Sequence, residues 1–449
     1  MASAAEQMAA NLNWGSFGKA KELQARILFA LGLLIVYRVG TYIPVPGIDT
    51  IELQRFFEEA SRGIGGMLNM FTGGAVSRMA IFTLGIMPYI SASIIVQLLS
   101  AMVPSLEALK KEGEAGRKKL NQYTRYGTVA LATVQAYGIS VGLEGQGLVL
   151  DPGWFFRASA VITLVGGTMF LMWLGEQITQ RGIGNGISLI IFTGIVAETP
   201  AALAQFLSQG RSGAISPGFM LFVFALSIVL VLFIVFMERA LRKITIQYPR
   251  RQVGMKVYGG ENSNLPIKLN PAGVIPAIFA SALLLLPTTV STFAANDGTG
   301  ILSYVNAYIG RGQPLFLVFF AAMIVFFTYF YTANVSFKSE DVADNLKKQG
   351  GFVPGIRPGP RTVDYLDYVV SRILVLGSGY LALVCLIPEI LFSNLPIVPF
   401  IFGGTSLLIV VSVTMDTITQ VQSHMLAHQY EGLIEKSKLR GKGRKKKKL

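Results

Sequence analysis

Charged residues are scarce in this sequence. Only 14% of its 449 residues are Asp, Glu, Lys or Arg, against roughly 25% in soluble globular domains, and 52% are hydrophobic. A chain this long and this poor in charge cannot cover its apolar side chains with a polar surface, so the composition argues against a soluble globular protein.

Cysteine and histidine are almost absent. The single cysteine, Cys385, excludes a disulfide framework within one chain and is best explained as an apolar filler of a helix core. The two histidines, His424 and His428, have a spacing that suits metal ligands on one helical face, but no third ligand or HEXXH glutamate accompanies them. We therefore expect neither a metal site nor a cofactor. The sequence also lacks the nucleophile and base that a membrane-embedded enzyme would need.

Apolar residues come instead in long blocks. A hydrocarbon core of ~30 Å takes about 20 apolar residues per helix. On this criterion the sequence predicts ten membrane-spanning helices, near residues 27–43, 80–103, 126–143, 155–175, 186–207, 218–237, 272–290, 314–335, 368–387 and 397–419. The residues before the first block lack the basic start and cleavage site of a signal peptide, so we expect the first block to be retained.

The Lys and Arg residues alternate between the two sides of these spans. If the N-terminus is cytoplasmic, the inside segments hold 30 Lys and Arg residues and the outside segments hold 5. Cytoplasmic loops of membrane proteins carry such an excess. The bias predicts a multi-pass protein of the cell inner membrane with both termini in the cytoplasm, and it accounts for most of the net charge of +14.

Ionisable groups are rare within the predicted spans. Arg38 lies late in the first span, where its side chain can reach the outer interface, while Glu176, Glu238 and Asp416 lie at span ends. No chain of carboxylates and histidines crosses the bilayer, which argues against an ion-coupled solute transporter, the strongest rival function. The stretch RGIGNGIS (residues 181–188) follows a span rather than a strand and lacks the Lys-Ser/Thr of a phosphate loop, so it predicts a tight turn.

Ten spans divide into two sets of five. An odd number of spans per set gives the second half the opposite orientation, which is the arithmetic of an inverted repeat. We therefore expect an all-α integral membrane fold with a cytoplasmic N-terminal segment (1–26), an N-terminal half (27–208), a C-terminal half (209–420) and a basic cytoplasmic tail (421–449).

A short apolar segment lies between the first two spans. Residues 63–75, GIGGMLNMFTGGA, would reach only ~20 Å as a helix, too short to cross the bilayer. Gly73 and Gly74 separate the segment from the next span. A half-helix at membrane depth is tolerated only where protein or a water-filled cavity shelters it. A helix on the outer surface explains the same residues equally well, and the residues alone leave both readings open.

Two loops on the predicted cytoplasmic side carry basic tips. In residues 239–270, KITIQY and VGMKVY alternate apolar and polar residues around YPRRQ, which predicts a β-hairpin with Arg250 and Arg251 at its tip. In residues 336–366, glycines and prolines stiffen the loop around Arg357. Such tips suit docking to an acidic partner or to RNA phosphate, although a solvated, topology-setting loop has the same composition. The lysine-rich tail suits anionic lipid or ribosomal RNA.

Six long motifs follow one another along the chain: GGAVSRMAIFTLGIMPYISASIIVQLL, KKEGEAGRKKLNQYTRYGT, GTMFLMWLGEQITQRGIGNGIS, NPAGVIPAIFAS, ADNLKKQGGFVPGIRPG and FGGTSLLIVVSVTMD. In content and order they resemble the SecY family, the channel subunits of the general protein-translocation machinery, over about residues 19–432. The resemblance implies a ten-helix clamshell of two five-helix halves. It implies a passive, non-enzymatic pore that passes unfolded preproteins across the bacterial inner membrane and inserts membrane proteins laterally. The implied partners are the SecE and SecG subunits, the SecA ATPase, the ribosome with its nascent chain, signal peptides and preproteins, and membrane lipid.

The resemblance also assigns roles to residues that are otherwise ordinary. It implies a pore ring of six isoleucines: Ile86, Ile90, Ile187, Ile191, Ile278 and Ile409. It implies that residues 63–75 are a re-entrant plug, which favours the half-helix reading, with a centre at Gly66, Met67, Leu68, Asn69, Met70 and Phe71. It implies a lateral gate between spans 2–3 and 7–8 with polar positions at Ser91, Gln97 and Asn270. It implies docking of SecA and the ribosome at Arg250, Arg251, Lys256 and Arg357.

Overall fold

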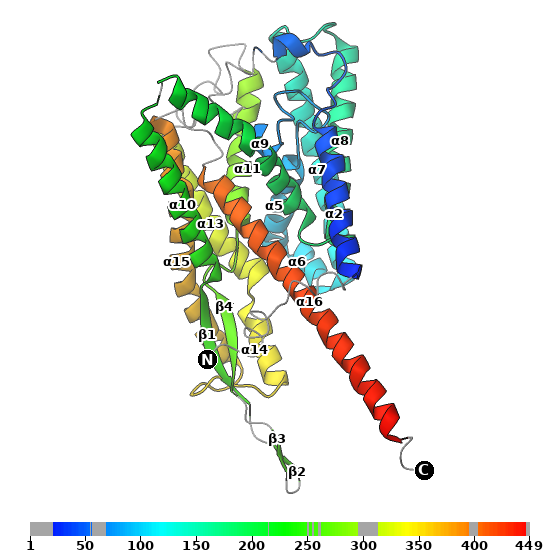
Figure 1. Cartoon of the computed structure of the whole chain (residues 1–449), viewed down its shortest axis with the longest axis vertical. Coiled ribbons are helices and arrows are strands. Elements are labelled where there is room, and N and C mark those ends of the chain that lie inside the picture. Colours follow the sequence, from blue (N-terminus) through cyan, green and yellow to red (C-terminus); the bar gives the residue numbers. More distant parts are fainter. Residues whose placement is uncertain are drawn as a thin grey trace.

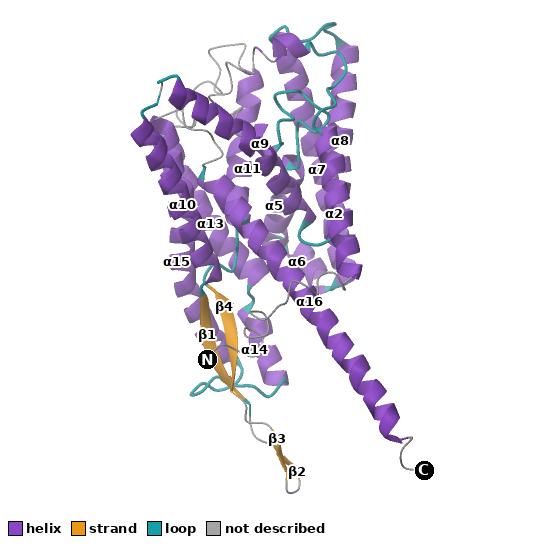
Figure 2. Cartoon of the chain, viewed as in Figure 1, coloured by secondary structure: helices purple, strands orange, loops and turns teal. Residues whose placement is uncertain are grey.

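The structure is a computed structural model of the chain. It describes residues 21–53, 55, 69–213, 215–248, 251–253, 256–258, 262–294, 313–394 and 403–445. Within these ranges the side chains of residues 251–258, 285–294, 392–394 and 427–445 are not described. Helices form an elongated bundle, and a β-ribbon projects from one end, which we call the hairpin end (Figures 1 and 2).

The N-terminal half consists of helices joined by turns. They are α2 (Lys21–Gly40), α5 (Met87–Met102), α6 (Pro104–Lys111), α7 (Glu114–Gly145), α8 (Trp154–Arg181) and α9 (Gly186–Arg211). The C-terminal half contains helices and four strands. They are α10 (Pro217–Arg239), β1 (Leu241–Gln247), β2 (Arg251–Val253), β3 (Lys256–Tyr258), β4 (Asn262–Lys268), α11 (Ile275–Ala294), α13 (Pro314–Tyr331), the π-helix η2 (Thr332–Ser336), α14 (Ser339–Lys348), α15 (Pro360–Asn394) and α16 (Gly404–Lys445).

Each predicted span overlaps a helix in the described part of the chain. Seven helical segments there are long and apolar enough to cross a membrane, at α2, α8, α9, α10, α13–α14, α15 and α16. An eighth is the pair α5 and α6, which meet at a bend of 99°. The chain is therefore a mostly helical membrane protein with several spans. The count of ten spans stays a prediction. The helix α7 does not meet the same criterion of length and hydropathy, and neither does the part of α11 whose side chains are described.

The second predicted span begins later than expected. Residues 72–86 form turns, and the helix starts at Met87 rather than near residue 80. Three glycines and Met79 have positive φ in this stretch, for example +65° at Gly73 and +82° at Gly74. A right-handed helix cannot include such residues, and Pro88 suits the first turn of the helix that follows.

The ribbon is antiparallel, but the predicted register is wrong. β1 pairs with β4, from Leu241 opposite Lys268 to Gln247 opposite Asn262. KITIQY therefore pairs with residues of β4 rather than with VGMKVY, and β2 pairs with β3 farther out. Arg251 lies within β2, and the connection falls between Val253 and Lys256. It contains Gly254, a stronger signal for a two-residue hairpin turn than Pro249.

Helices of the two predicted halves meet in two places. On one side α11 packs against α5 and α7, and on the other α16 packs against α9 and α2. We call the contact of α11 with α5 and α7 the seam. The halves are joined in sequence between α9 and α10, where Phe206, Ile215 and Val223 form a small core.

The segments predicted to share one side of the membrane come together at the hairpin end. Leu23 of α2, Ile183 of the α8–α9 turn and Met425 of α16 form one apolar cluster. Lys268 of β4 lies 3.9 Å from Asp416 of α16. These contacts agree with the alternation of basic segments, while the side that the hairpin end faces stays a prediction.

Candidate functional site

The six predicted ring isoleucines gather in the largest apolar cluster. Two lie on α5 or at its N-cap, two on α9, one on α11 and one on α16. Five are buried side chains of the cluster, and Ile187 packs against it; the buried five are Ile86, Ile90, Ile191, Ile278 and Ile409. The isoleucines of one apolar cluster therefore come from four helices, two in each predicted half.

The end of the predicted plug packs into this same cluster. Asn69, Met70 and Phe71 are helical, whereas Gly66, Met67 and Leu68 lie outside the described residues. Met70 and Phe71 are 6% and 7% exposed and belong to the cluster of the isoleucines. Ser406 at the start of α16 donates from Oγ to Met70 Sδ at 3.6 Å. The described part of residues 63–75 is thus enclosed by protein.

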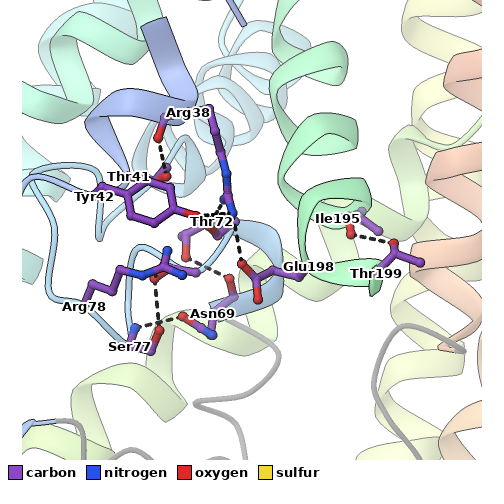
Figure 3. A network of polar contacts seen from close by, with 12 residues as sticks. Arg38, Thr41, Tyr42, Asn69, Thr72, Ser77, Arg78, Ile195, Glu198 and Thr199 are labelled. Atoms are coloured by element: carbon purple, nitrogen blue, oxygen red, sulfur yellow. Dashed lines mark hydrogen bonds and ion pairs between the residues drawn. The ribbon is translucent and has the colours of Figure 1, made fainter. Parts of the chain in front are cut away.

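Polar contacts fold the end of this segment into a compact turn (Figure 3). The backbone N–H of Ser77 donates to Asn69 Oδ1 at 2.8 Å, and Thr72 Oγ1 donates to the carbonyl of Asn69 at 3.2 Å. Ser77 Oγ donates to the carbonyl of Gly74 at 3.0 Å. These bonds satisfy backbone groups that have no helical partner after Phe71.

Arg38 contacts the turn that follows Phe71. One guanidinium nitrogen donates to the carbonyl of Gly73, and the other donates to Tyr42 Oη at 3.0 Å and lies 3.7 Å from Glu198 Oε1 (Figure 3). Glu198, on α9, was missed by sequence reasoning. The sequence could have suggested the pair with Arg38. The two predicted spans run in the same direction from residues 27 and 186, and Arg38 and Glu198 lie at a similar distance from these starts.

The predicted gate residues do not bond to one another: Ser91 and Gln97 lie on α5, and Asn270 comes just before α11. Asn270, just before α11, donates to Glu238 Oε1 at 2.9 Å and to the carbonyl of Gly273 at 3.0 Å, both in its own half. Gln97 of α5 donates to Ser93 Oγ at 3.1 Å. Ser91 Oγ, Gln97 Oε1 and Asn270 Oδ1 are each buried without a hydrogen-bond partner among the described residues.

A cleft of about 810 Å³ opens at the hairpin end of the seam. It lies between α5, α6 and α7 of one half and η2 and α14 of the other, and its basic lining residues are Lys110, Lys111, Arg117 and Lys338. Lys110 Nζ donates to the carbonyl of Asn334 at 2.8 Å, which connects the two halves. Burial, followed by the charge of Lys338, lowers the pKa of Lys110 from its ordinary value.

Three of the four predicted docking residues are described, and they lie at the hairpin end. Arg250 is outside the described residues, while the register places Arg251 opposite Tyr258 and Lys256 opposite Val253. Arg357 is exposed on a loop that is attached to the ribbon by backbone hydrogen bonds between Gln247 and Phe352 of 2.9 and 3.0 Å. A shared apolar core that includes Ile244 of β1 and Val353 of the loop fixes the loop and the ribbon together.

The last candidates from the sequence are the single cysteine and the two histidines. Cys385 is 2% exposed within the main apolar cluster, as expected for a core filler. His424 is exposed, and the side chain of His428 is not described. Among the side chains that are described, no three His, Cys, Asp or Glu residues gather as a metal site.

Comparisons with known proteins agree on one family. The SecY family model matches residues 80–418. The chain is 51% identical to the protein translocase subunit SecY of Escherichia coli strain K12 over 432 residues, which cover 95% of this chain and 97% of that protein. It is 52% identical over 429 residues to the protein of the same name from Pseudomonas aeruginosa, with coverage of 95% and 97%.

Solved structures share the fold. A structure of a protein-conducting channel aligns with a TM-score of 0.64 at 18% identity and covers 90% of this chain and 92% of its own. Sec61 in the canine ribosome-channel complex from the endoplasmic reticulum aligns with a TM-score of 0.61 at 17% identity, with the same coverage. At these identities the two structures establish the fold of the bundle.

Proposed function

The chain belongs to the SecY family, and from this premise we propose how its residues let a polypeptide through a membrane. It is the channel subunit of a protein translocase and performs no bond chemistry. We propose that unfolded preproteins pass along the middle of the bundle and that apolar segments leave sideways into lipid. The observation that carries the proposal is the single cluster that contains five of the isoleucines and the plug residues Met70 and Phe71, with the sixth, Ile187, packed against it.

The isoleucines form the closing constriction. Branched aliphatic side chains offer an ion no replacement for its hydration shell, so a narrow ring of them excludes water and ions. They also form no specific hydrogen bonds, so a chain of any sequence can slide past. Their origin on α5, α9, α11 and α16 supports this role, because separating the two halves would widen the ring.

The plug is residues 63–75. Its described end packs against the ring cluster, and Gly73 and Gly74 let the chain turn away before α5 begins. A segment held this way blocks the path while the channel is idle and leaves it when a polypeptide enters.

The lateral gate is the seam. Opening it separates α11 from α5 and α7, helices that belong to different halves of a ten-helix, inverted-repeat clamshell. The buried unpaired oxygens of Ser91, Gln97 and Asn270 support this role, because an unpaired polar atom destabilises the closed contact by about 1–3 kcal/mol. A signal segment then partitions into lipid, driven by ~0.8 kcal/mol per buried CH₂.

The hairpin end faces the cytoplasm of a bacterial cell and docks the partners that drive transport. The β1 and β4 strands of the ribbon and the loop of Arg357 share one apolar core, so the base of the ribbon holds the exposed Arg357 in place. This cationic end suits SecA and the ribosome, including ribosomal RNA phosphate, and SecE and SecG are the partner subunits expected from the family. We expect Arg357→Glu to impair SecA-driven secretion more than membrane insertion; an equal loss of both would remove its special role.

The constriction is tested by weakening it. The translocase carrying Ile90→Ser and Ile278→Ser is reconstituted in a planar bilayer without substrate, and ion conductance is recorded. Two hydroxyls in the ring let water enter, so leak is expected to rise at least about tenfold, in line with a few kcal/mol per buried apolar side chain that is lost. A matched control is Ile234→Ser, which changes a fully buried isoleucine of the same cluster on α10. Unchanged conductance in the ring variant, or an equal rise in the control, would contradict the proposal.

A further inference from the structure

Two oppositely charged residues lie beside the end of the proposed plug. Arg38 lies near the end of α2 and Glu198 lies on α9, and both helices are apolar enough to span a membrane. The guanidinium of Arg38 donates to the carbonyl of Gly73 and lies 3.7 Å from Glu198 Oε1 (Figure 3). The planar guanidinium of Arg38 thus contacts the plug backbone and a carboxylate of a neighbouring helix at the same time.

The backbone of the plug turn approaches α9 closely. A Cβ added to Gly74 would lie 2.5 Å from Glu198 Oε1, and a Cβ added to Gly73 would lie 3.1 Å from the Cα of Gly194. Both glycines have positive φ, which other residues adopt only with strain. The turn therefore fits between α2 and α9 only because it has no side chains there.

A simple ion pair between two helices would not need this arrangement. The side chains of Arg38 and Glu198 are 27% and 22% exposed, so both charges are largely withdrawn from solvent. A withdrawn charge is costly unless it is paired and hydrogen-bonded. The carboxylate of Glu198 holds the guanidinium beside the plug, and the guanidinium uses its other nitrogen on the plug itself.

We propose that Glu198 is a positioning residue that keeps Arg38 on the Gly73 carbonyl and so holds the plug in its closed seat. We call this contact the plug latch. The inference rests on the proposed role of residues 63–75 as the plug. An entering polypeptide must break the latch, and the strength of the latch sets how often an idle channel opens by itself.

The first test removes only the charge of Glu198. In the purified translocase, Glu198→Gln is expected to raise the substrate-free ion leak about fivefold, the size expected when one partly exposed ion pair is lost. Plug position is read in parallel from disulfide formation between Met70→Cys and Ser406→Cys, in a Cys385→Ala background. These two positions are in contact in the closed seat, since Met70 Sδ lies 3.6 Å from Ser406 Oγ. The Glu198→Gln change should slow this disulfide by a similar factor.

The matched control is another ion pair that does not touch the plug. Arg157 and Glu144 join α8 and α7 with a distance of 2.6 Å, and the carboxylate is only 8% exposed. If loss of any ion pair loosens the channel, Glu144→Gln should raise leak at least as much as Glu198→Gln. The latch predicts no change in leak or disulfide rate for Glu144→Gln, and equal effects of the two variants would overturn it.

A double-mutant cycle shows whether Glu198 acts through Arg38. Arg38→Gln should raise leak more than Glu198→Gln, because it also removes the bond to Gly73, and the double variant should leak no more than Arg38→Gln alone. Additive effects would overturn the latch. A separate arm tests the plug itself: if the channel with the Met70–Ser406 disulfide formed still translocates at the normal rate, the proposed plug is wrong, whatever the Glu198 variants show.

Discussion

The plug turn and the seam are built in opposite ways. Around the plug turn, Asn69, Thr72, Ser77 and Arg38 each make hydrogen bonds that tie the turn to itself or to α2. At the positions proposed for the gate in this seam, Ser91, Gln97 and Asn270 each bury an oxygen that has no partner among the described residues. The first contact is strengthened by polar groups, and the second is weakened by them.

This difference suits the roles proposed for the two contacts. A channel that is idle for most of the time needs a closed path, and paired polar groups would fix one position of the proposed plug. A seam that serves as the proposed gate has to open at small cost, and unpaired polar atoms lower the stability of its closed form. Changes in the two regions should therefore move leak and lateral insertion separately.

The largest effect is expected from a steric change at the plug turn. A Cβ at Gly194 would lie 2.9 Å from the carbonyl oxygen of Phe71 and 3.2 Å from the nitrogen of Gly73. Gly194→Val should push the plug from its seat and raise substrate-free leak about tenfold or more, the size expected from overpacking. Gly166→Val on α8 is the control, because a Cβ there meets nothing within 4 Å. A silent Gly194→Val would show that the turn does not need this close fit.

A smaller effect is expected at the proposed gate, where the change should stabilise the closed state instead of opening the channel. Ser91→Ala removes a buried unpaired hydroxyl and should stabilise the closed gate by about 1–2 kcal/mol. Test segments of graded hydrophobicity would then need about one or two more buried CH₂ groups to insert. Insertion is measured with such a series of segments, and leak should stay unchanged.

The control for Ser91 is a paired hydroxyl on the other side of the seam. Ser281 of α11 is also buried, but its Oγ donates to the carbonyls of Ala277 and Ile278, both at 2.9 Å. Ser281→Ala should leave the insertion threshold in place. If both variants shift it equally, the unpaired oxygen is not the cause.

The smallest effect is expected at the basic cleft. Lys110 is half-buried and joins α6 to η2 through the carbonyl of Asn334, so Lys110→Met should ease lateral opening by about two- to fivefold. Lys111→Met is the matched control, since Lys111 is 71% exposed and pairs with Glu107 of its own helix. The two variants are compared by the insertion of one weakly apolar segment. Equal responses would show that the loss of a positive charge, and not the loss of the bond to Asn334, causes the effect.

The sequence predicted the helices because lipid thickness fixes the length of an apolar block. Each predicted span overlaps a described helix, but the sequence placed the start of α5 too early, since nothing in the hydropathy signals the positive φ of Met79 or Gly74. The ribbon register was wrong because the sequence reading paired KITIQY with the alternating segment nearest to it, whereas β1 pairs with β4. The alternation of apolar and polar residues within one segment does not show which other segment it pairs with, because tertiary contacts decide the pairing.

The site was predicted unevenly. The isoleucines are ordinary span residues, and only the family resemblance singled them out before the structure gathered them into one cluster. Glu198 was missed because its meaning depends on Arg38, a residue far away in the chain. The contact of Lys110 with Asn334 was invisible for the same reason, since a bond to a backbone carbonyl leaves no pattern in the side chains.

The central claim is that polypeptide passes through the ring of isoleucines. It is tested most directly by placing a photo-crosslinking residue at Ile86 or at Ile278, on opposite sides of the seam, and stalling a secretory chain in the translocase. The account predicts strong crosslinks from both positions to the stalled chain, and weak ones from Ile234 on α10. A stalled chain that crosslinks to neither Ile86 nor Ile278 would contradict it.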